Sequence, residues 1–253
     1  GFGVQKKESV VGAIVQVKGS ELVQSGVSNI TSALSGKLSG VTTLQNSGMP
    51  GEDNAEIIIR GKSSWVSSSP LVLVDGIERE YTDINLNDVE TMSVLKDASA
   101  TAIYGTKGAN GVILITTKRG KEDKASINIS VNQGFKLPTN RQTYYNAYET
   151  LQHANVAMKN DNNWSGLFSP TELEHYKKQD NPYKNPSVDW YNEMVKDVGY
   201  VTDLNFNVSG GTKKVKYFGS LSYLHDGDII NTKENGDYDP RFYYDRLNMR
   251  TNL

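Results

Sequence analysis

The second half of the chain is dominated by stretches in which every other residue is apolar, and this pattern constrains the fold more than any other feature. In Ile127–Val131, for example, isoleucine and valine alternate with asparagine and serine. A period of two places alternate side chains on opposite faces of a β-strand. A length of about 10 residues with one apolar face is typical of a strand that crosses a membrane. We therefore expect antiparallel strands at about 125–135, 201–209, 215–224 and 243–253.

The connections between these stretches favour one architecture over another. The first connection has more than sixty residues (136–200), the second is the tight turn Gly210–Lys214, and the third is the polar stretch Asp226–Pro240. Long external loops that alternate with short periplasmic turns are typical of an outer-membrane barrel. We therefore expect residues 122–253 to form the N-terminal part of a transmembrane β-barrel. A soluble antiparallel sandwich with one buried face remains the alternative, because alternation alone fits both.

The first long connection contains helical signals of its own. Residues Thr143–Lys159 have a helical pattern, and Ser169–Glu172 combines a capping box with proline at the first helical position. A structured insertion of this size on a barrel indicates a functional external loop. We expect residues 136–200 to form a helical extracellular loop.

The first half of the chain has a different pattern, in which short helices and short β-rich runs alternate. Helices are expected at Ser28–Leu38 and Asp97–Tyr104, each closed by a nearby glycine. The run Val112–Thr117 is apolar on both faces and should lie centrally in a small sheet. Further short strands are expected at Val41–Leu44, Glu56–Ile59 and Leu71–Val74. Residues 1–121 are thus predicted to form an α+β domain.

Composition excludes several classes of function. The chain has no cysteine, which excludes a disulfide scaffold and a thiolate metal site. Its 27 basic and 29 acidic residues give a formal net charge of -2, so the charge balance does not indicate a nucleic-acid partner. Its apolar runs are far shorter than the ~20 residues of a membrane helix, although barrel strands escape such a scan. No nucleophile–base arrangement stands out, and we expect no enzymatic activity.

Four motifs of the first half resemble one family of transporters. The stretch Val94–Gly105 with Gly108–Lys118 is similar to the most diagnostic part of the plug domain in SusC-like TonB-dependent outer-membrane transporters. The family's PLxVxDG, IRG and GYGTQKK segments are matched by Pro70–Gly76, Ile58–Gly61 and Gly1–Lys7. The matches occur in the family's order and cover about the first 120 residues.

The resemblance implies an α+β plug domain inside a barrel that has about 22 strands in the full-length family. It implies TonB-dependent active import of a nutrient across the bacterial outer membrane, with the plug facing the periplasm and gating the barrel. The substrate would be an oligosaccharide or, less often, a peptide. A SusD-like surface lipoprotein would be the partner, with dimers of transporter–lipoprotein pairs. TonB, with ExbB and ExbD, would act through a segment that lies upstream of Gly1 in the family.

Two other functions remain open at this point. One is a ligand-sensing outer-membrane receptor that signals rather than transports. The other is a soluble β-rich binding module, which is the functional counterpart of the sandwich fold.

Candidate substrate-binding residues lie between the expected strands of the first half. Trp65 is a large aromatic residue in the polar, serine-rich segment Lys62–Ser69. Because aromatic rings stack on sugars, we take Trp65, with Ser64, Ser67 and Tyr81, as the candidate substrate contacts. The alternative for Trp65 is packing against the barrel wall or neighbouring loops.

Other polar motifs favour structural roles. Gly105–Gly111 precedes a strand, whereas a phosphate-binding loop follows one, so it indicates a turn. Asp75-Gly76 predicts a turn after a buried strand. Arg60 is either a solvated charge or a partner for carboxylates. Within the loop Asp226–Asp239, Asn235-x-Asp237-x-Asp239 begins like a calcium loop, but Pro240 stands where the turn glycine should be. We expect no cofactor, with calcium in this loop as the minor alternative.

Overall fold

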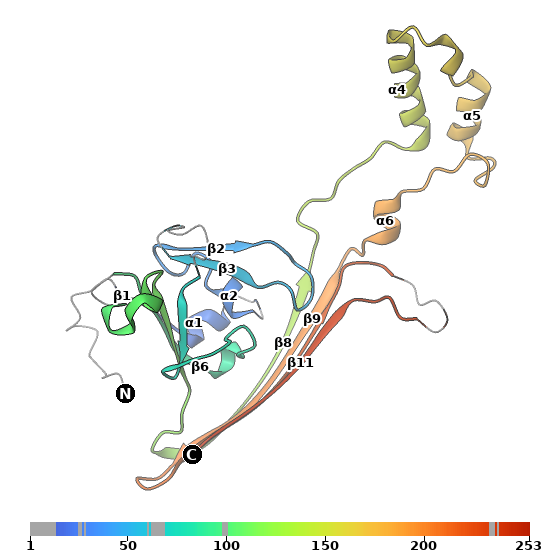
Figure 1. Ribbon diagram of the computed structural model, residues 1–253. Helices are drawn as coiled ribbons and strands as arrows, with labels where there is room; N and C mark the ends of the chain where they lie inside the picture. Colours follow the sequence, from blue (N-terminus) through green and yellow to red (C-terminus); the bar gives the residue numbers. More distant parts are fainter. Residues whose placement is uncertain are drawn as a thin grey trace. The chain divides into compact units, whose positions relative to one another are not determined.

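The computed structural model describes residues 14–24, 27, 29–59, 61, 69–97, 101–232, 236 and 238–253. The chain forms two compact units. The first unit contains Gly1–Phe135, Tyr200–Asp228 and Phe242–Leu253, and the second contains Lys136–Gly199 and Ile229–Arg241. The first unit holds the sheets, and the second holds the long helices (Figure 1).

Five short strands form one sheet within the described part of the first unit. They are β1 (Ile14–Lys18), β4 (Leu71–Val74), β5 (Ile77–Glu78), β6 (Val89–Leu95) and β7 (Val112–Thr117), in the order β1-β6-β7-β4-β5. β7 lies in the middle, parallel to β4 and antiparallel to β6. The central position expected for Val112–Thr117 is confirmed, and the adjacent side chains of Val112 and Ile113, on opposite faces, are both fully buried.

The main hydrophobic core lies between this sheet and two short helices, α1 (Gly19–Val23) and α2 (Ile30–Ala33). Leu22 and Ile30 from the helices are fully buried in the same cluster as Met92 and Ile113 from the sheet. Full burial of one such side chain contributes about 1.5–3 kcal/mol. The five-stranded sheet and its helices, here called the five-stranded domain, therefore have a core of their own.

Of the two helices expected in this half, one is shorter than predicted and the other is described only in part. The helix expected at Ser28–Leu38 is only α2, which is capped by Asn29 and followed by Gly36 at a φ of 70°. Of the helix expected at Asp97–Tyr104, the structure describes an α-helical bond from the Thr101 N–H to the Asp97 carbonyl at 3.0 Å. It is followed by the 3-10 helix η3 (Ala102–Gly108), in which Gly105 has a φ of 61°. Glycine adopts positive φ readily, and at these two positions it interrupts the helical path. Ser28 and residues 98–100 lie outside the described residues.

Two further elements complete the domain. β2 (Val41–Gln45) and β3 (Ala55–Ile59) form an antiparallel hairpin, which confirms the strands expected there. The 3-10 turn η2 (Leu86–Asp88) leads directly into β6.

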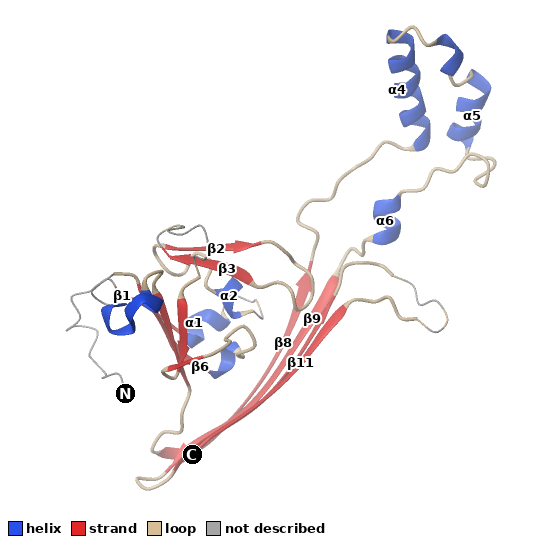
Figure 2. Ribbon diagram, viewed as in Figure 1, coloured by secondary structure: helices blue, strands red, loops and turns tan. Residues whose placement is uncertain are grey.

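Four long strands form a second sheet in the described part of the first unit (Figure 2). They are β8 (Asp123–Lys136), β9 (Gly199–Gly211), β10 (Lys216–Gly227) and β11 (Tyr243–Asn252), in the order β11-β10-β9-β8. β10 is antiparallel to both β9 and β11. Each of the four predicted stretches coincides with one of these strands, with ends that differ by up to three residues.

The two faces of this long sheet have different surroundings. On one face of β10, Phe218, Ser220 and Leu224 are buried. On the opposite face of the sheet, the side chains of Ile129 and Met249 are 73% and 79% exposed. Strict alternation along the strands therefore gives one contact face and one outward, apolar face.

The second unit consists mainly of helices. They are α4 (Ala147–Asn160), the 3-10 turn η4 (Trp164–Gly166), α5 (Pro170–Lys178) and α6 (Trp190–Met194). α5 begins with the expected capping box, in which Ser169 and Glu172 bond each other's backbone N–H groups and proline occupies the first helical position. α4 begins at the cap Asn146, three residues after the predicted start. No helix in the described parts of the chain is long and apolar enough to cross a membrane.

Candidate functional site

The contact face of the long sheet meets the five-stranded domain along a polar seam. Alternate residues of β11, from Tyr244 to Asn252, form hydrogen bonds or ion pairs with loops and turns of that domain. Ser220 of β10 adds a further bond. We call this set of contacts the seam.

The first part of the seam is centred on Asp75, in the turn between β4 and β5. Asp75 and Gly76 have φ values of 51° and 87°, which confirms the expected turn. The Asp75 carboxylate accepts a hydrogen bond from the Thr117 backbone N–H at 3.0 Å and another from the Thr117 hydroxyl. Arg250 of β11 donates to Asp75 Oδ2 at 3.2 Å and to the Thr117 hydroxyl. One guanidinium of the long sheet is thus held by both a turn and the central strand of the domain.

The second part of the seam contains a buried carboxylate, Asp88, at the end of η2. Ser220 of β10 donates to Asp88 Oδ2 at 2.9 Å, and both residues are buried. Asp88 Oδ1 has no hydrogen-bond partner among the described residues. Burial raises the pKa of the Asp88 carboxyl above its ordinary value, although the Ser220 hydrogen bond and the charges of Arg250 and Lys118 act in the opposite direction.

The third part of the seam connects β11 to backbone carbonyls of the domain. Arg246 donates to the Thr82 carbonyl at 3.3 Å, and Asn248 donates to the Asp83 carbonyl at 2.8 Å. Asn252 donates to the Lys118 carbonyl at 3.3 Å. The three acceptors are backbone carbonyls of loop residues that lie outside the strands. These bonds therefore depend on the path of the loops.

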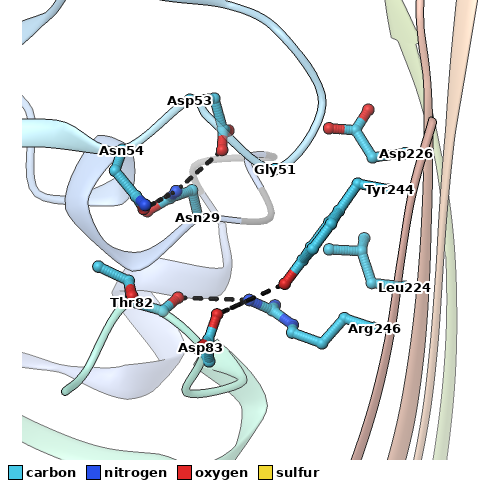
Figure 3. A pocket seen from close by; sticks show the side chains of 10 residues that line it. All are labelled: Asn29, Gly51, Asp53, Asn54, Thr82, Asp83, Leu224, Asp226, Tyr244 and Arg246. Carbon is cyan, nitrogen blue, oxygen red and sulfur yellow. Dashed lines mark hydrogen bonds and ion pairs between the residues drawn. The ribbon is translucent and has the colours of Figure 1, made fainter. Parts of the chain in front are cut away.

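A recess opens beside the third part of the seam. Figure 3 shows Tyr244 and Arg246 pointing from the long strands toward the segments that carry Asp83 and Asn29. The Tyr244 ring passes close to Gly51, where an added Cβ would lie 2.7 Å from the ring. Only glycine allows this approach. The recess is lined by Asn29, Gly51, Asp53, Asn54, Thr82, Asp83, Leu224, Asp226, Tyr244 and Arg246.

Some polar groups of the recess form hydrogen bonds with one another. Asn29 donates to Asp53 at 3.0 Å and to Asn54 at 2.7 Å, while its oxygen caps α2. Tyr244 is 3.4 Å from Asp83, whose side chain is exposed. Carboxylates, amides and a phenol are groups that hydrogen-bond hydroxyl- or amide-bearing ligands. The recess is therefore polar, with carboxylates and one guanidinium among its lining groups.

The structure places only one of the four candidate substrate contacts. Tyr81 is partly buried and packs against the main core, and burial raises the pKa of its hydroxyl. Ser64, Trp65 and Ser67 lie outside the described residues, as does Arg60. Their roles stay predictions.

The loop with calcium-like spacing is described only in part. Asn235 and Asp237 lie outside the described residues. Asp239 is paired with Arg241 through two hydrogen bonds of 2.8 Å, which lower the pKa of its carboxyl. Among the residues that the structure describes, no group of three or more His, Asp or Glu side chains could hold a metal ion.

Sequence reasoning missed the seam. Asp88 and Ser220 are separated by 132 positions, and neither belongs to a motif. The one available signal was the pair of arginines, Arg246 and Arg250, on the polar face of a predicted strand. An arginine on the inward face of a barrel strand needs a carboxylate or carbonyl partner, and these two have such partners in the domain.

Comparisons with known proteins agree on one family. Residues 6–112 match the model described as the TonB-dependent Receptor Plug Domain. The chain is 32% identical over 270 residues to the TonB-dependent receptor SusC of Bacteroides thetaiotaomicron, a match that covers 100% of this chain and 25% of the relative. It is 32% identical over 237 residues to the TonB-dependent receptor P39 of Formosa agariphila, covering 91% of this chain and 21% of that protein.

Solved structures give the same result. The structure of the RagAB peptide transporter matches with a TM-score of 0.79 and 27% identity, over 96% of this chain and 29% of that chain. The RagAB peptide importer in its closed-closed state matches with a TM-score of 0.78 and 26% identity, over 96% and 28% of the two chains. The chain thus spans about a quarter of the length of the proteins it matches.

Proposed function

Because the chain belongs to the SusC-like TonB-dependent receptors, we propose that it is the plug domain and first barrel strands of a transporter that imports a nutrient across the bacterial outer membrane. On this proposal, residues 1–121 form the plug, and residues 122–253 begin the barrel wall. Import would be active and would draw on TonB with ExbB and ExbD.

The observation that carries the proposal is the difference between the two faces of the long sheet. One face forms the seam with the plug, through Asp75–Arg250 and Asp88–Ser220. The other face presents exposed apolar side chains such as Ile129 and Met249. A wall that encloses a plug needs polar contacts inside and an apolar surface toward lipid.

The chemistry of the seam suits a gate. A neutral hydrogen bond contributes about 0.5–1.5 kcal/mol net and one to a charged group about 1.5–3 kcal/mol, so single contacts can be broken and formed again. Together they would hold the plug against the wall at rest. A pull on the N-terminal side of the plug would then open a path by breaking these contacts.

The proposed substrate is an oligosaccharide, with a peptide as the second candidate. The peptide is retained because the solved relative at 27% identity is described as the RagAB peptide transporter. The polar recess beside Tyr244 supports either, since hydroxyls and peptide amides need the same donors and acceptors. The proposed partner is a SusD-like surface lipoprotein, with a dimer of such pairs. We propose neither a cofactor nor an enzymatic activity.

An uptake assay tests the function. Cells that carry the full-length gene should accumulate a fluorescent oligosaccharide or peptide, and cells that lack it should not. A protonophore should abolish accumulation while surface binding persists, because only import needs the proton gradient. Accumulation that resists the protonophore would contradict energised import. A transcriptional response to the ligand without accumulation would favour the signalling receptor.

The proposal also fixes an orientation, with residues 141–199 outside the cell and Gly210–Lys214 in the periplasm. In this family the plug enters the barrel from the periplasm, so β8 must run outward and β9 must return. Because the chain has no cysteine, Lys178→Cys and Thr212→Cys can be compared with a membrane-impermeant maleimide on whole cells. Lys178, whose side chain is 62% exposed, should be labelled, and Thr212 should not. Labelling at Thr212 alone would reverse the orientation.

A substitution of Trp65 tests the candidate substrate contact. We expect Trp65→Ala to weaken substrate binding by about 1 kcal/mol, roughly fivefold, because it removes a stacking face. The amount of receptor in the outer membrane, measured in parallel, should not change. Unchanged uptake kinetics would assign Trp65 to packing.

A further inference from the structure

The outward face of the long sheet is ordered in rows that cross the strands. Backbone pairing aligns Tyr223 of β10 with Leu204 of β9 and Leu247 of β11. Two residues further toward the β9–β10 turn, Leu221, Phe206 and Met249 form the next row in the same way. These rows are apolar and partly or largely exposed.

One row on this face is polar on all four strands. His225 of β10 is paired with Thr202 of β9 and with Asp245 of β11. His225 Nδ1 lies 2.7 Å from Asp245 Oδ1, and the Thr202 hydroxyl donates to Gln133 Oε1 of β8 at 2.9 Å. Tyr223, in the row below, donates its hydroxyl to Asp245 at 2.8 Å. We call Gln133, Thr202, His225 and Asp245 the polar row.

An aromatic row follows the polar row, on the side away from the β9–β10 turn. Phe135 of β8 and Tyr200 of β9 pack edge to face, with ring centroids 5.8 Å apart. Tyr243 of β11 lies 6.0 Å from the His225 ring. The order along the strands is therefore apolar, polar, aromatic.

We propose that the polar row marks the outer boundary of the lipid hydrocarbon, and that the polar and aromatic rows contact the headgroups of outer-leaflet lipids. This inference rests on the proposed function, because it requires the long strands to cross the outer membrane. Charged residues on the lipid face of a barrel strand are costly at the bilayer midplane and tolerated near its interfaces. His225 and Asp245 therefore belong at an interface. Tyrosine is enriched at the same level in membrane proteins.

The length of the apolar part agrees with this boundary. On β10, the levels of Tyr217, Gly219, Leu221 and Tyr223 lie between the turn and the polar row. At about 3.4 Å per residue and a tilt of about 40°, four levels cover roughly 20 Å of membrane depth. The bacterial outer membrane is thinner than an average bilayer, so four to five levels suffice. The polar row lies at the end from which the long connections leave, which on the proposed orientation is the outer leaflet.

Spin labels along β9 test the boundary. Single cysteines at Tyr200, Thr202, Leu204 and Phe206 of a cysteine-free full-length receptor carry a nitroxide, in vesicles of phosphatidylethanolamine and phosphatidylglycerol. Collision rates with oxygen report hydrocarbon, and collision rates with a nickel chelate report water. We expect the oxygen-to-nickel ratio to be at least threefold higher at Leu204 and Phe206 than at Thr202. The ratio at Tyr200 should be close to that of a reference label at the exposed Lys178.

The outcomes separate this inference from the proposed function. A ratio at Thr202 as high as at Leu204 would overturn the boundary while leaving the membrane strands intact. Aqueous values at all four sites would mean that β9 does not cross the bilayer, and the proposed function would fail first.

A matched pair of charges gives a second test. Thr202→Asp and Leu204→Asp place the same charge in adjacent rows of one strand. Thr202→Asp should leave the receptor level in the outer membrane near the original value, whereas Leu204→Asp should lower it at least threefold. Equal levels for the two variants would contradict a boundary between these rows.

Discussion

The two sheets of the first unit differ in composition, and they depend on different surroundings. In the five-stranded sheet, Val94 and Ile113 are fully buried by the plug's own side chains. In the long sheet, Ile129 and Met249 remain mostly exposed. The plug therefore contains the partners of its strands, whereas the long strands need the plug on one face and, on our proposal, lipid on the other. The sheet of the plug is therefore the more autonomous of the two.

Expressing the plug and the long strands as separate fragments tests this difference most directly. We expect residues 1–121 alone to give a dispersed amide spectrum and a cooperative melt, because their core is internal. Residues 122–253 alone should form no closed barrel, because four strands leave two open edges and each unpaired backbone group in lipid costs several kcal/mol. A plug fragment that lacks a cooperative melt would contradict the comparison.

Two isoleucines of the plug, one buried and one exposed, test whether its stability comes from its own core. Ile113→Ala in the 1–121 fragment should lower the free energy of unfolding by about 2–5 kcal/mol, because it leaves a cavity in the core. Ile77→Ala is the matched control, because Ile77 is 68% exposed and its truncation should change stability by about 0.5 kcal/mol or less. Chemical denaturation measures both. Equal losses would mean that the core is wrongly placed.

The seam predicts a smaller effect that appears only when both sheets are present. Arg250→Gln in the full-length receptor should lower its stability by about 1–3 kcal/mol, because Asp75 loses a partly buried charged partner. Arg241→Gln is the control, since its ion pair with Asp239 is more exposed and is screened by solvent, so its loss should cost less. Thermal melting in detergent measures the difference. A larger loss for Arg241→Gln would argue against the seam.

The smallest expected effect is a dependence on pH through Asp88. Burial raises the pKa of this carboxyl in the folded receptor, so the folded state binds the proton more tightly than the unfolded state. The proton's contribution to stability is complete below the ordinary pKa of an aspartate and is lost as pH rises through the raised value. Asp88→Asn should remove this part of the pH dependence in melting curves between acid and neutral pH. Identical curves for both proteins would show that Asp88 is solvated.

The strands of the fold were largely predictable because their pattern is local. β7 is a continuous apolar run, and apolar and polar residues alternate along the four long strands. The burial of each residue in these strands can therefore be predicted from its immediate neighbours in the sequence. β6 was not predicted, because a register shift between Val89 and Thr91 breaks its alternation. The helix at Ser28–Leu38 was overestimated, since alanine and leucine favour helix while the positive φ of Gly36 depends on the surrounding fold.

The candidate site was much less predictable than the fold. Asp75 was recognised as a turn residue, but its partner Arg250 lies 175 positions away. Such a pair leaves no local pattern in a single sequence. The burial of Asp88 could not be predicted from the sequence either, because it results from contact with the separate long sheet.

The place of β1 at the edge of the plug sheet has a consequence for the order of events during synthesis. Among the described strands, β1 pairs only with β6, and the partner of Lys18 is Thr91, more than seventy residues later in the chain. While the polypeptide grows from its N-terminus, this strand has no partner, and closing so long a loop is slow. Of its five residues only Val17 is buried, so the docking of β1 removes little apolar surface from water. β1 therefore docks late, and its detachment would expose little apolar surface.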